Sequence, residues 1–84
     1  MTYNILINKK ARKFITAQPR NRQIHLLEAI YKLPDIGDIK PIVGKKDMYR
    51  LRFGDYRIIY TLQRNIPTVT VINAGNRGDI YDDL

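Results

Sequence analysis

Residues 48–62, MYRLRFGDYRIIYTL, restrict the fold of this chain more than any other stretch. Apolar and aromatic residues alternate with polar ones on both sides of Gly54 and Asp55, a pattern typical of two strands joined by a tight turn. With a two-residue turn, counting outward places Arg52 opposite Arg57. Like charges that face each other across two strands destabilise a sheet by roughly a few tenths to 1 kcal/mol. A small domain needs a reason to accept this pair.

The two faces of the predicted hairpin differ in their chemistry. One face is expected to be covered by helices, and it receives Tyr49, Leu51, Phe53, Tyr56, Ile58 and Tyr60. The other face receives Arg50, Arg52 and Arg57, with Ile59 and Thr61 beside them. A solvated face would interleave charges of both signs, and within the hairpin only Asp55 is acidic. The pattern therefore favours a face that binds an anion through guanidinium groups.

The remaining segments predict two helices before the hairpin and one strand after it. Residues 3–8 alternate like a half-buried strand, and Asn8 is placed to cap a helix over residues 9–18, before Pro19. A second helix is expected over about residues 20–33, with its apolar stripe at Ile24, Leu27, Ile30 and Tyr31, widened by Leu26 and Leu33. Residues 34–47 hold two prolines and two glycines and are predicted to form a loop, and residues 68–75 form the last strand.

The resulting order, βααβββ, predicts an α+β fold with two N-terminal helices on one face of a small antiparallel sheet. The chain has 84 residues, so residues 1–84 are expected to form a single domain. A domain of this size buries only about 60 to 65% of the surface that its unfolded chain exposes. The core is therefore expected to be thin.

The composition of the chain indicates the cellular compartment and the charge of the binding partner. The absence of cysteine excludes disulfides and a thiolate nucleophile, and it suits a reducing cytoplasm. No signal-peptide pattern and no apolar run of membrane-spanning length occurs, so a soluble cytoplasmic protein without a membrane partner is expected. The formal net charge is +7, which favours an anionic partner such as RNA, DNA, an acidic protein or an anionic lipid surface.

The hairpin YRLRFGDYRIIY and the closing NAGNRGDIY, in a basic chain with two N-terminal helices, resemble the RelE/ParE superfamily of bacterial toxins. The resemblance covers nearly the whole chain and is most specific at residues 49–60 and at Gly75, Arg77, Ile80 and Tyr81. It implies a RelE-like fold and a toxin that a cognate antitoxin neutralises. In the RelE branch it also implies an endoribonuclease that cuts mRNA in the ribosomal A site. No metal and no small-molecule cofactor are implied.

The resemblance also implies roles for individual residues. The basic strand positions of the family correspond to Arg50 and Arg52, and an arginine of the next strand corresponds to Arg57. The C-terminal arginine and tyrosine of the family correspond to Arg77 and Tyr81. The expected catalytic residues are therefore Arg52, Arg57, Arg77 and Tyr81. The expected RNA-binding residues are Arg50, Lys9, Lys10 and Lys13, although a solvated helix face explains the three lysines equally well.

Two departures from the family pattern affect the expected chemistry. Ribosome-dependent members often carry lysine where this chain has Arg50 and Arg52, and many carry histidine or lysine where it has Asn76. Arginine stays protonated, so it holds a phosphate but does not exchange protons with the substrate. In metal-free RNA cleavage the 2′-hydroxyl attacks the phosphate, and Arg77 would stabilise the developing charge. Tyr81 would either stack on a base or transfer a proton.

Other chemistries have less support. His25 is the sole histidine, which excludes a two-histidine ribonuclease mechanism. Asp79, Asp82 and Asp83 are expected to form a solvated acidic tail rather than a metal site. Two alternatives on the same fold stay open: a ParE-like toxin that inhibits DNA gyrase, and a catalytically degenerate module that only binds the antitoxin.

Overall fold

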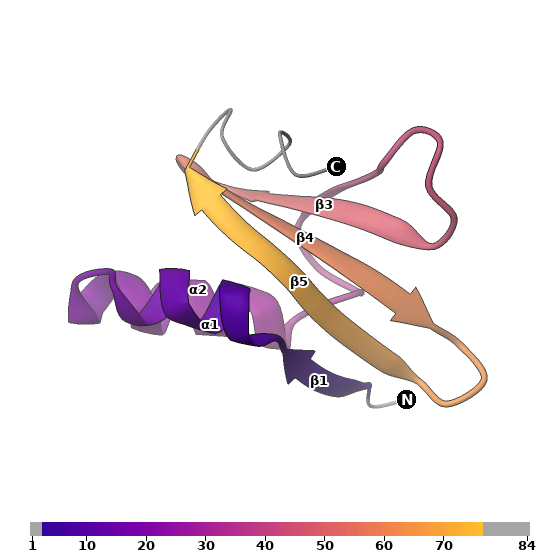
Figure 1. Cartoon of the computed structure of the whole chain (residues 1–84), viewed down its shortest axis with the longest axis horizontal. Helices are drawn as coiled ribbons and strands as arrows, with labels where there is room; N and C mark the ends of the chain where they lie inside the picture. The colour runs from indigo at the N-terminus through magenta and orange to yellow at the C-terminus, as the bar shows by residue number, and fades with distance from the viewer. Residues whose placement is uncertain (1–2, 77–84) are drawn as a thin grey trace.

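Seven elements follow one another along residues 3–76, the part of the chain that the computed structural model describes (Figure 1). They are β1 (Asn4–Ile7), α1 (Lys9–Thr16), α2 (Arg20–Tyr31), β2 (Asp38–Pro41), β3 (Met48–Phe53), β4 (Tyr56–Gln63) and β5 (Thr68–Asn76). The five strands form one sheet in the order β1-β5-β4-β3-β2, and both helices pack on the same face of it. The predicted α+β fold, with two helices on one face of the sheet, is confirmed.

The sheet differs from the sequence prediction at both of its edges. Residues 38–41, predicted as part of a loop, form β2 and pair antiparallel with β3. Pro41 is tolerated because β2 is an edge strand and Pro41 is its last residue. At the other edge β1 pairs with β5 in parallel, so the sheet is mostly and not wholly antiparallel.

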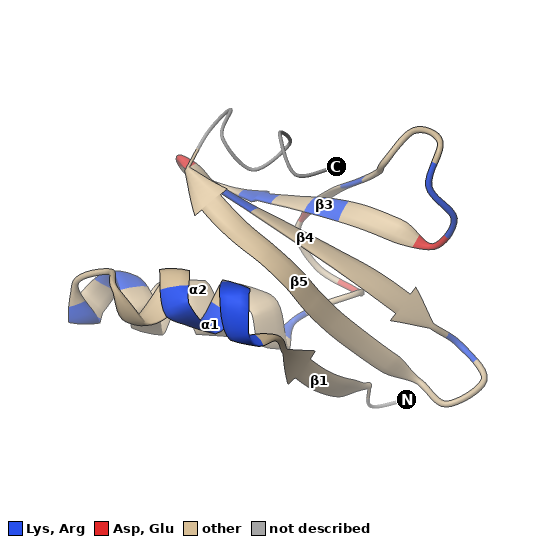
Figure 2. Ribbon diagram, viewed as in Figure 1, with Lys and Arg blue, Asp and Glu red and all other residues tan. Residues whose placement is uncertain are grey.

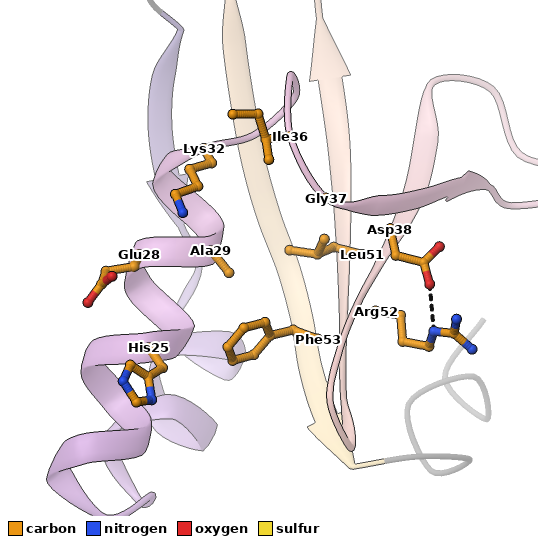
Figure 3. A pocket seen from close by; sticks show the side chains of 10 residues that line it. All are labelled: His25, Glu28, Ala29, Lys32, Ile36, Gly37, Asp38, Leu51, Arg52 and Phe53. Atoms are coloured by element: carbon orange, nitrogen blue, oxygen red, sulfur yellow. Dashed lines mark hydrogen bonds and ion pairs between the residues drawn. The ribbon is translucent and has the colours of Figure 1, made fainter.

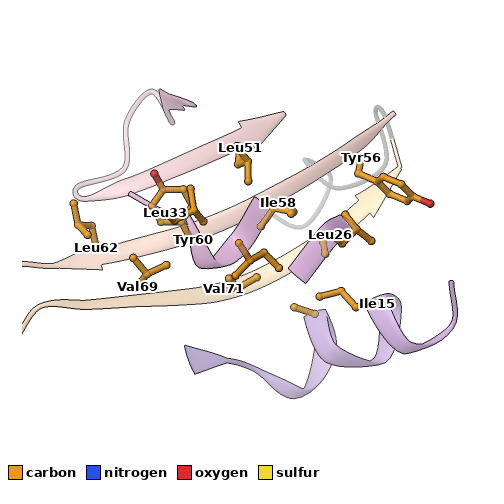
Figure 4. Packing of buried hydrophobic residues seen from close by; sticks show 13 residues of the cluster. Ile15, Leu26, Leu33, Leu51, Tyr56, Ile58, Tyr60, Leu62, Val69 and Val71 are labelled. Atoms are coloured by element: carbon orange, nitrogen blue, oxygen red, sulfur yellow. The ribbon is translucent and has the colours of Figure 1, made fainter. Parts of the chain in front are cut away.

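The core lies between the helices and the sheet (Figure 4). The helices contribute Ala11 and Ile15 from α1 and Leu26 and Ile30 from α2. The strands contribute the buried side chains of Leu51, Tyr56, Ile58, Tyr60, Leu62, Val69, Val71 and Ala74. The apolar face predicted for the hairpin is confirmed, because Tyr49 and Phe53 also pack against this cluster.

The buried side of α2 is not the stripe that the sequence suggested. Leu26 and Ile30 are fully buried, whereas Ile24 is 48% and Tyr31 is 62% exposed. Both sets of residues have helical spacing, so periodicity alone did not distinguish them. The prediction was right for Ile30 and wrong for Ile24 and Tyr31, because Leu26 and Leu33, treated as a widening of the stripe, form its buried centre together with Ile30.

Asn8 and a β-bulge set the register of the last strand. The Asn8 side chain caps α1 by accepting a hydrogen bond from the Ala11 amide (2.9 Å), as predicted, and its Nδ2 donates to the Ile72 carbonyl (2.8 Å). The register between β4 and β5 shifts between Ile59 and Tyr60, which leaves Ile72 as the extra residue. Val71 and Ala74 therefore both join the core, while Asn73 lies opposite Ile59 on the other face.

Within residues 3–76, no helix is long and apolar enough to cross a membrane.

Candidate nucleic-acid interface

The sheet face opposite the helices collects basic side chains from β2, β3 and β4, and we call it the arginine face. Its basic members are Lys40, Arg50, Arg52 and Arg57. The strand registers arrange this face in two rows across the sheet. The first row is Asp38, Arg52, Arg57 and Gly75, and the second is Lys40, Arg50, Ile59 and Asn73. Figure 2 shows basic residues on β3 and β4 close to the hairpin turn.

The pairing of Arg52 with Arg57 is confirmed, and β2 supplies the charge that makes it tolerable. Arg52 Nε donates to Asp38 Oδ2 over 2.6 Å (Figure 3). Arg50 Nη2 lies 3.8 Å from Asp38 Oδ1. The opposite charges of Asp38 and Arg52 also face each other in the strand register, which is a favourable cross-strand pair. The neutralising carboxylate thus comes from a neighbouring strand and not from the hairpin itself.

Arg57 is held by backbone carbonyl groups. Its Nη1 donates to the Gly54 carbonyl (3.1 Å) and to the Tyr56 carbonyl (2.9 Å), and the residue is only 9% exposed. Two acceptors in and beside the hairpin turn thus fix the charged group without a carboxylate. Arg57 thus contributes a positive charge to the arginine face from a poorly exposed, hydrogen-bonded position.

The three arginines differ in their access to a ligand. The Arg52 side chain is 55% exposed, whereas the Arg50 side chain is 12% exposed. One carboxylate, Asp38, offsets part of the charge of three guanidinium groups. The arrangement can bind an anion such as a phosphate, with Arg52 as the contact residue and Arg50 and Arg57 as supporting charges.

Sequence reasoning missed Asp38 and Lys40, although a signal was present. In GDIKP the polar Asp38 and Lys40 alternate with Ile39, which packs against the core. This alternation is short, and the prolines and glycines around it led to the prediction of a loop instead of a strand. Gly37 helps to seat the strand, because a Cβ atom built there would lie 2.6 Å from Leu51 Cδ1.

The other predicted site residues are not brought to the arginine face by the described structure. Lys9, Lys10 and Lys13 are exposed on α1, in the helical layer on the opposite side of the sheet. They do not share a surface with the arginines, so any RNA contact they make is a separate one. Arg77 and Tyr81 lie outside the described residues, and their roles stay predictions.

A cleft of about 330 Å³ lies on the helical side, between α2 and the β2–β3 edge of the sheet (Figure 3). Leu51 and Phe53 point into it toward α2, where His25 stands at its border, while Asp38 and Arg52 point the other way. His25 is exposed on α2. Within residues 3–76, no three His, Asp or Glu side chains gather in a group suited to hold a metal ion.

The clearest pKa shift among the described tyrosines belongs to the core and not to the arginine face. Burial, with a smaller effect of Tyr49, raises the pKa of Tyr60 to about 12. Tyr60 therefore keeps its proton at neutral pH and is no base. The Tyr60 ring stacks on Tyr49, with ring centroids 5.6 Å apart. Hydrogen bonds from Arg64 to Tyr49 and Asp47 raise the pKa of the Arg64 guanidinium.

Two helices against a mostly antiparallel five-stranded sheet are the architecture of the RelE-like toxins. The sequence matches the family described as the ParE toxin of the type II toxin-antitoxin system parDE, over residues 7–81. The chain therefore belongs to this family, within the RelE/ParE superfamily, and is the toxin of a toxin-antitoxin pair.

Solved structures agree with this assignment. RelE in the archaeal RelE-RelB complex from Pyrococcus horikoshii is 28% identical, with a TM-score of 0.76 over 94% of this chain and 99% of that chain. The RelB-RelE complex from Methanococcus jannaschii matches at 26% identity and a TM-score of 0.74, covering 94% of this chain and 98% of that one.

A mutant of the E. coli toxin RelE in the free state shares the fold, at 20% identity and a TM-score of 0.77, over 98% of this chain and 93% of that one. No curated protein matches the chain.

Proposed function

We propose that this toxin is a metal-independent, ribosome-dependent endoribonuclease that cleaves mRNA and thereby inhibits translation. The observation that carries the proposal is the arginine face, on the side of the sheet opposite the helices, where Asp38 contacts Arg50 and Arg52 and Arg57 faces Arg52 from the next strand. An mRNA in the ribosomal A site presents the single-stranded phosphates that such a face binds. The likeness to RelE structures at 26 to 28% identity adds support.

The proposed chemistry relies on the RNA for its nucleophile. The 2′-hydroxyl attacks the neighbouring phosphorus and the bond to the 5′-oxygen breaks, which leaves a cyclic phosphate and a free 5′-hydroxyl. Arg52 holds a non-bridging phosphate oxygen, and Arg57 adds positive potential from its fixed place beside the turn. Arg77 is proposed to stabilise the leaving oxygen, and Tyr81 to stack on a base or move a proton.

The test is primer extension on messages from cells that express the toxin, compared with purified ribosomes programmed with a defined mRNA. Cuts that follow the reading frame, and that require ribosomes, are the expected result. The matched control is Arg52→Ala, which removes the exposed guanidinium of the face. Intact messages in both systems would contradict the proposal.

A second candidate is inhibition of DNA gyrase, and the match to the ParE toxin family favours it. Both activities are compatible with one fold, so the fold does not separate them. Trapped gyrase–DNA complexes together with intact messages would select this candidate. If neither activity appears while antitoxin binding is retained, the chain is a degenerate antitoxin-binding module.

The proposed partners are a cognate antitoxin, the ribosome and mRNA, in the cytoplasm. The Pyrococcus horikoshii and Methanococcus jannaschii relatives are complexes of RelE with RelB. A basic toxin is suited to an antitoxin with an acidic segment that covers the arginine face or the adjacent helices.

A further inference from the structure

Asp38 contacts two arginines of the arginine face at once. Its Oδ2 accepts the 2.6 Å hydrogen bond from Arg52 Nε, while its Oδ1 faces Arg50 Nη2 at 3.8 Å. The carboxylate therefore bridges two guanidinium groups that come from alternate positions of β3. Backbone pairing of β2 with β3 fixes the place of Asp38 directly opposite Arg52.

The contact with Nε leaves the outer end of Arg52 available. A guanidinium group binds an oxyanion through two parallel N–H groups, and the two terminal nitrogens form one such pair. Within residues 3–76 these terminal nitrogens have no hydrogen-bond partner, and the Arg52 side chain is 55% exposed. Among the described residues, Asp38 thus engages the inner nitrogen and leaves the outer pair without a partner.

We propose that Asp38 is a positioning residue, which holds Arg50 and Arg52 as a pre-formed clamp for one RNA phosphate. This inference rests on the proposed function, because that function supplies the phosphate. Asp38 does not touch the phosphate; it restrains a flexible side chain that would otherwise lose its freedom on binding. Asp38 also offsets part of the repulsion between Arg52 and Arg57, although an exposed ion pair contributes little to folding stability.

Asp38 has two opposite effects on RNA. Its negative charge repels the phosphate, whereas the order that it imposes on Arg52 favours the bound geometry. Removing the charge therefore changes equilibrium binding only slightly, by less than about fivefold. The reaction rate depends on alignment within a fraction of an ångström, so it falls on the order of tenfold to a hundredfold. A small change in binding with a large change in rate identifies a positioning residue.

The experiment compares the full-length toxin with Asp38→Asn, which removes the charge and nearly keeps the shape. Asp38→Glu restores the charge on a longer side chain and is expected to recover part of the rate. Two controls match the charge change: Asp35→Asn alters an exposed residue nearby, and Asp47→Asn breaks the ion pair with Arg64. Thermal unfolding checks that each variant is folded.

Three quantities are measured: binding of a non-cleavable 2′-O-methyl single-stranded RNA, ribosome-dependent cleavage, and the Arg52 Nε–H signal by NMR. We expect Asp38→Asn to bind the RNA almost normally, to cleave slowly, and to lose the distinct Arg52 signal. Both controls should keep all three properties. Normal cleavage by Asp38→Asn, or a parallel fall in binding and rate, would overturn the positioning role.

The NMR measurement distinguishes failure of the nuclease proposal from failure of the proposed role of Asp38. If the wild-type toxin leaves messages intact, the Arg52 signal decides the role of Asp38 by itself. A signal that RNA shifts in the wild type, and that is absent in Asp38→Asn, supports the clamp. A signal that RNA does not shift, or that Asp38→Asn leaves unchanged, overturns it.

Discussion

Arg52 lies between a carboxylate and a second arginine. Asp38 faces it from β2 and Arg57 faces it from β4, so the like-charge contact on one side is offset by an ion pair on the other. Arg57 is in turn satisfied by two backbone carbonyls. The unfavourable pair that the hairpin sequence presents is therefore part of a local cluster with its own acceptors. Within residues 3–76, Arg52 is its most exposed arginine.

Arg52→Ala should weaken binding to single-stranded RNA and reduce its dependence on salt. The loss of one phosphate contact lowers the log–log salt slope by about 0.7. Fluorescence anisotropy with a labelled RNA at several salt concentrations measures both effects. Lys13→Ala is the matched control, because Lys13 lies on α1 in the opposite layer. An unchanged slope for Arg52→Ala would remove this residue from the interface.

Arg57→Ala should destabilise the fold as well as the site. It leaves the buried carbonyl of Tyr56 without its guanidinium donor, which costs roughly 1–3 kcal/mol, whereas the carbonyl of exposed Gly54 can bond water instead. Urea unfolding monitored by circular dichroism measures the loss. Arg52→Ala, whose side chain is 55% exposed, should lower the free energy of unfolding much less. Equal stability of the two variants would contradict the buried anchoring of Arg57.

Tyr60 should make the folded state sensitive to alkali. Its pKa is raised from 10.0 to about 12, so the folded state holds the proton after the unfolded chain has released it. The stabilisation is complete below pH 10.0 and is lost as the pH rises through that interval to about 12. The loss is on the order of 1–2 kcal/mol, because a tenfold change in proton affinity corresponds to about 1.4 kcal/mol and solvent screens part of the effect.

Urea unfolding at a series of alkaline pH values measures this effect. Tyr60→Phe is the control, because it keeps the ring that stacks on Tyr49 and removes the titrating hydroxyl. The variant should lose less stability than the wild type over the same interval. Identical profiles for the two proteins would show that Tyr60 is not the group responsible.

Among the elements, β2 has the largest effect on the site. It is an edge strand of four residues, yet it supplies both Asp38 and Lys40 to the arginine face. Its approach to β3 requires a close contact between Gly37 and Leu51. Gly37 also has a φ of +138°, a backbone conformation that residues with a side chain rarely adopt.

Gly37→Ala should therefore loosen β2 and disturb the ion pair between Asp38 and Arg52. The cost is roughly 1–3 kcal/mol, from backbone strain and the clash with Leu51. Hydrogen exchange of the amides in residues 38–41 measures the loosening. Gly44→Ala is the matched control, because Gly44 also has a positive φ (+81°) but open space around the added Cβ. A smaller effect at Gly37 than at Gly44 would contradict this account.

At the scale of the whole molecule, positive charge lies on two opposite layers. The arginine face occupies one side of the sheet, and the exposed lysines of α1 lie on the other. With a formal net charge of +7, the toxin has more basic groups than one phosphate contact uses. Substitutions on the arginine face and on α1 can therefore test separately whether each layer binds RNA or the antitoxin.

The cognate antitoxin should exclude RNA from the arginine face. We expect it to displace the labelled RNA in a competition assay, and we expect salt to weaken the complex if an acidic segment makes the contact. Arg52→Ala should weaken antitoxin binding, whereas Lys13→Ala should leave it unchanged if the segment covers the arginine face. Simultaneous binding of antitoxin and RNA would place the antitoxin elsewhere.

Local patterns in the sequence determined the hairpin, its two faces and the cap of α1. Arg52 opposite Arg57 follows from a two-residue turn and a side-chain period of two, and Asn8 needs only the next three residues to form its cap. These features depend on neighbours in the sequence, so they can be read from it. The resemblance of residues 49–60 to the RelE/ParE superfamily, confirmed by the family match, comes from the same stretch.

Contacts between distant segments decided the rest. Asp38 is 14 residues from Arg52, and no local pattern links them; their contact exists because β2 pairs with β3. The two apolar stripes of α2 have the same periodicity, and only packing against the sheet buries Leu26 and leaves Ile24 exposed. The parallel pairing of β1 with β5 likewise joins segments that are separated by all the other elements of the described fold. Only the tertiary structure determines these features, because each of them depends on contacts between elements that are distant in the sequence.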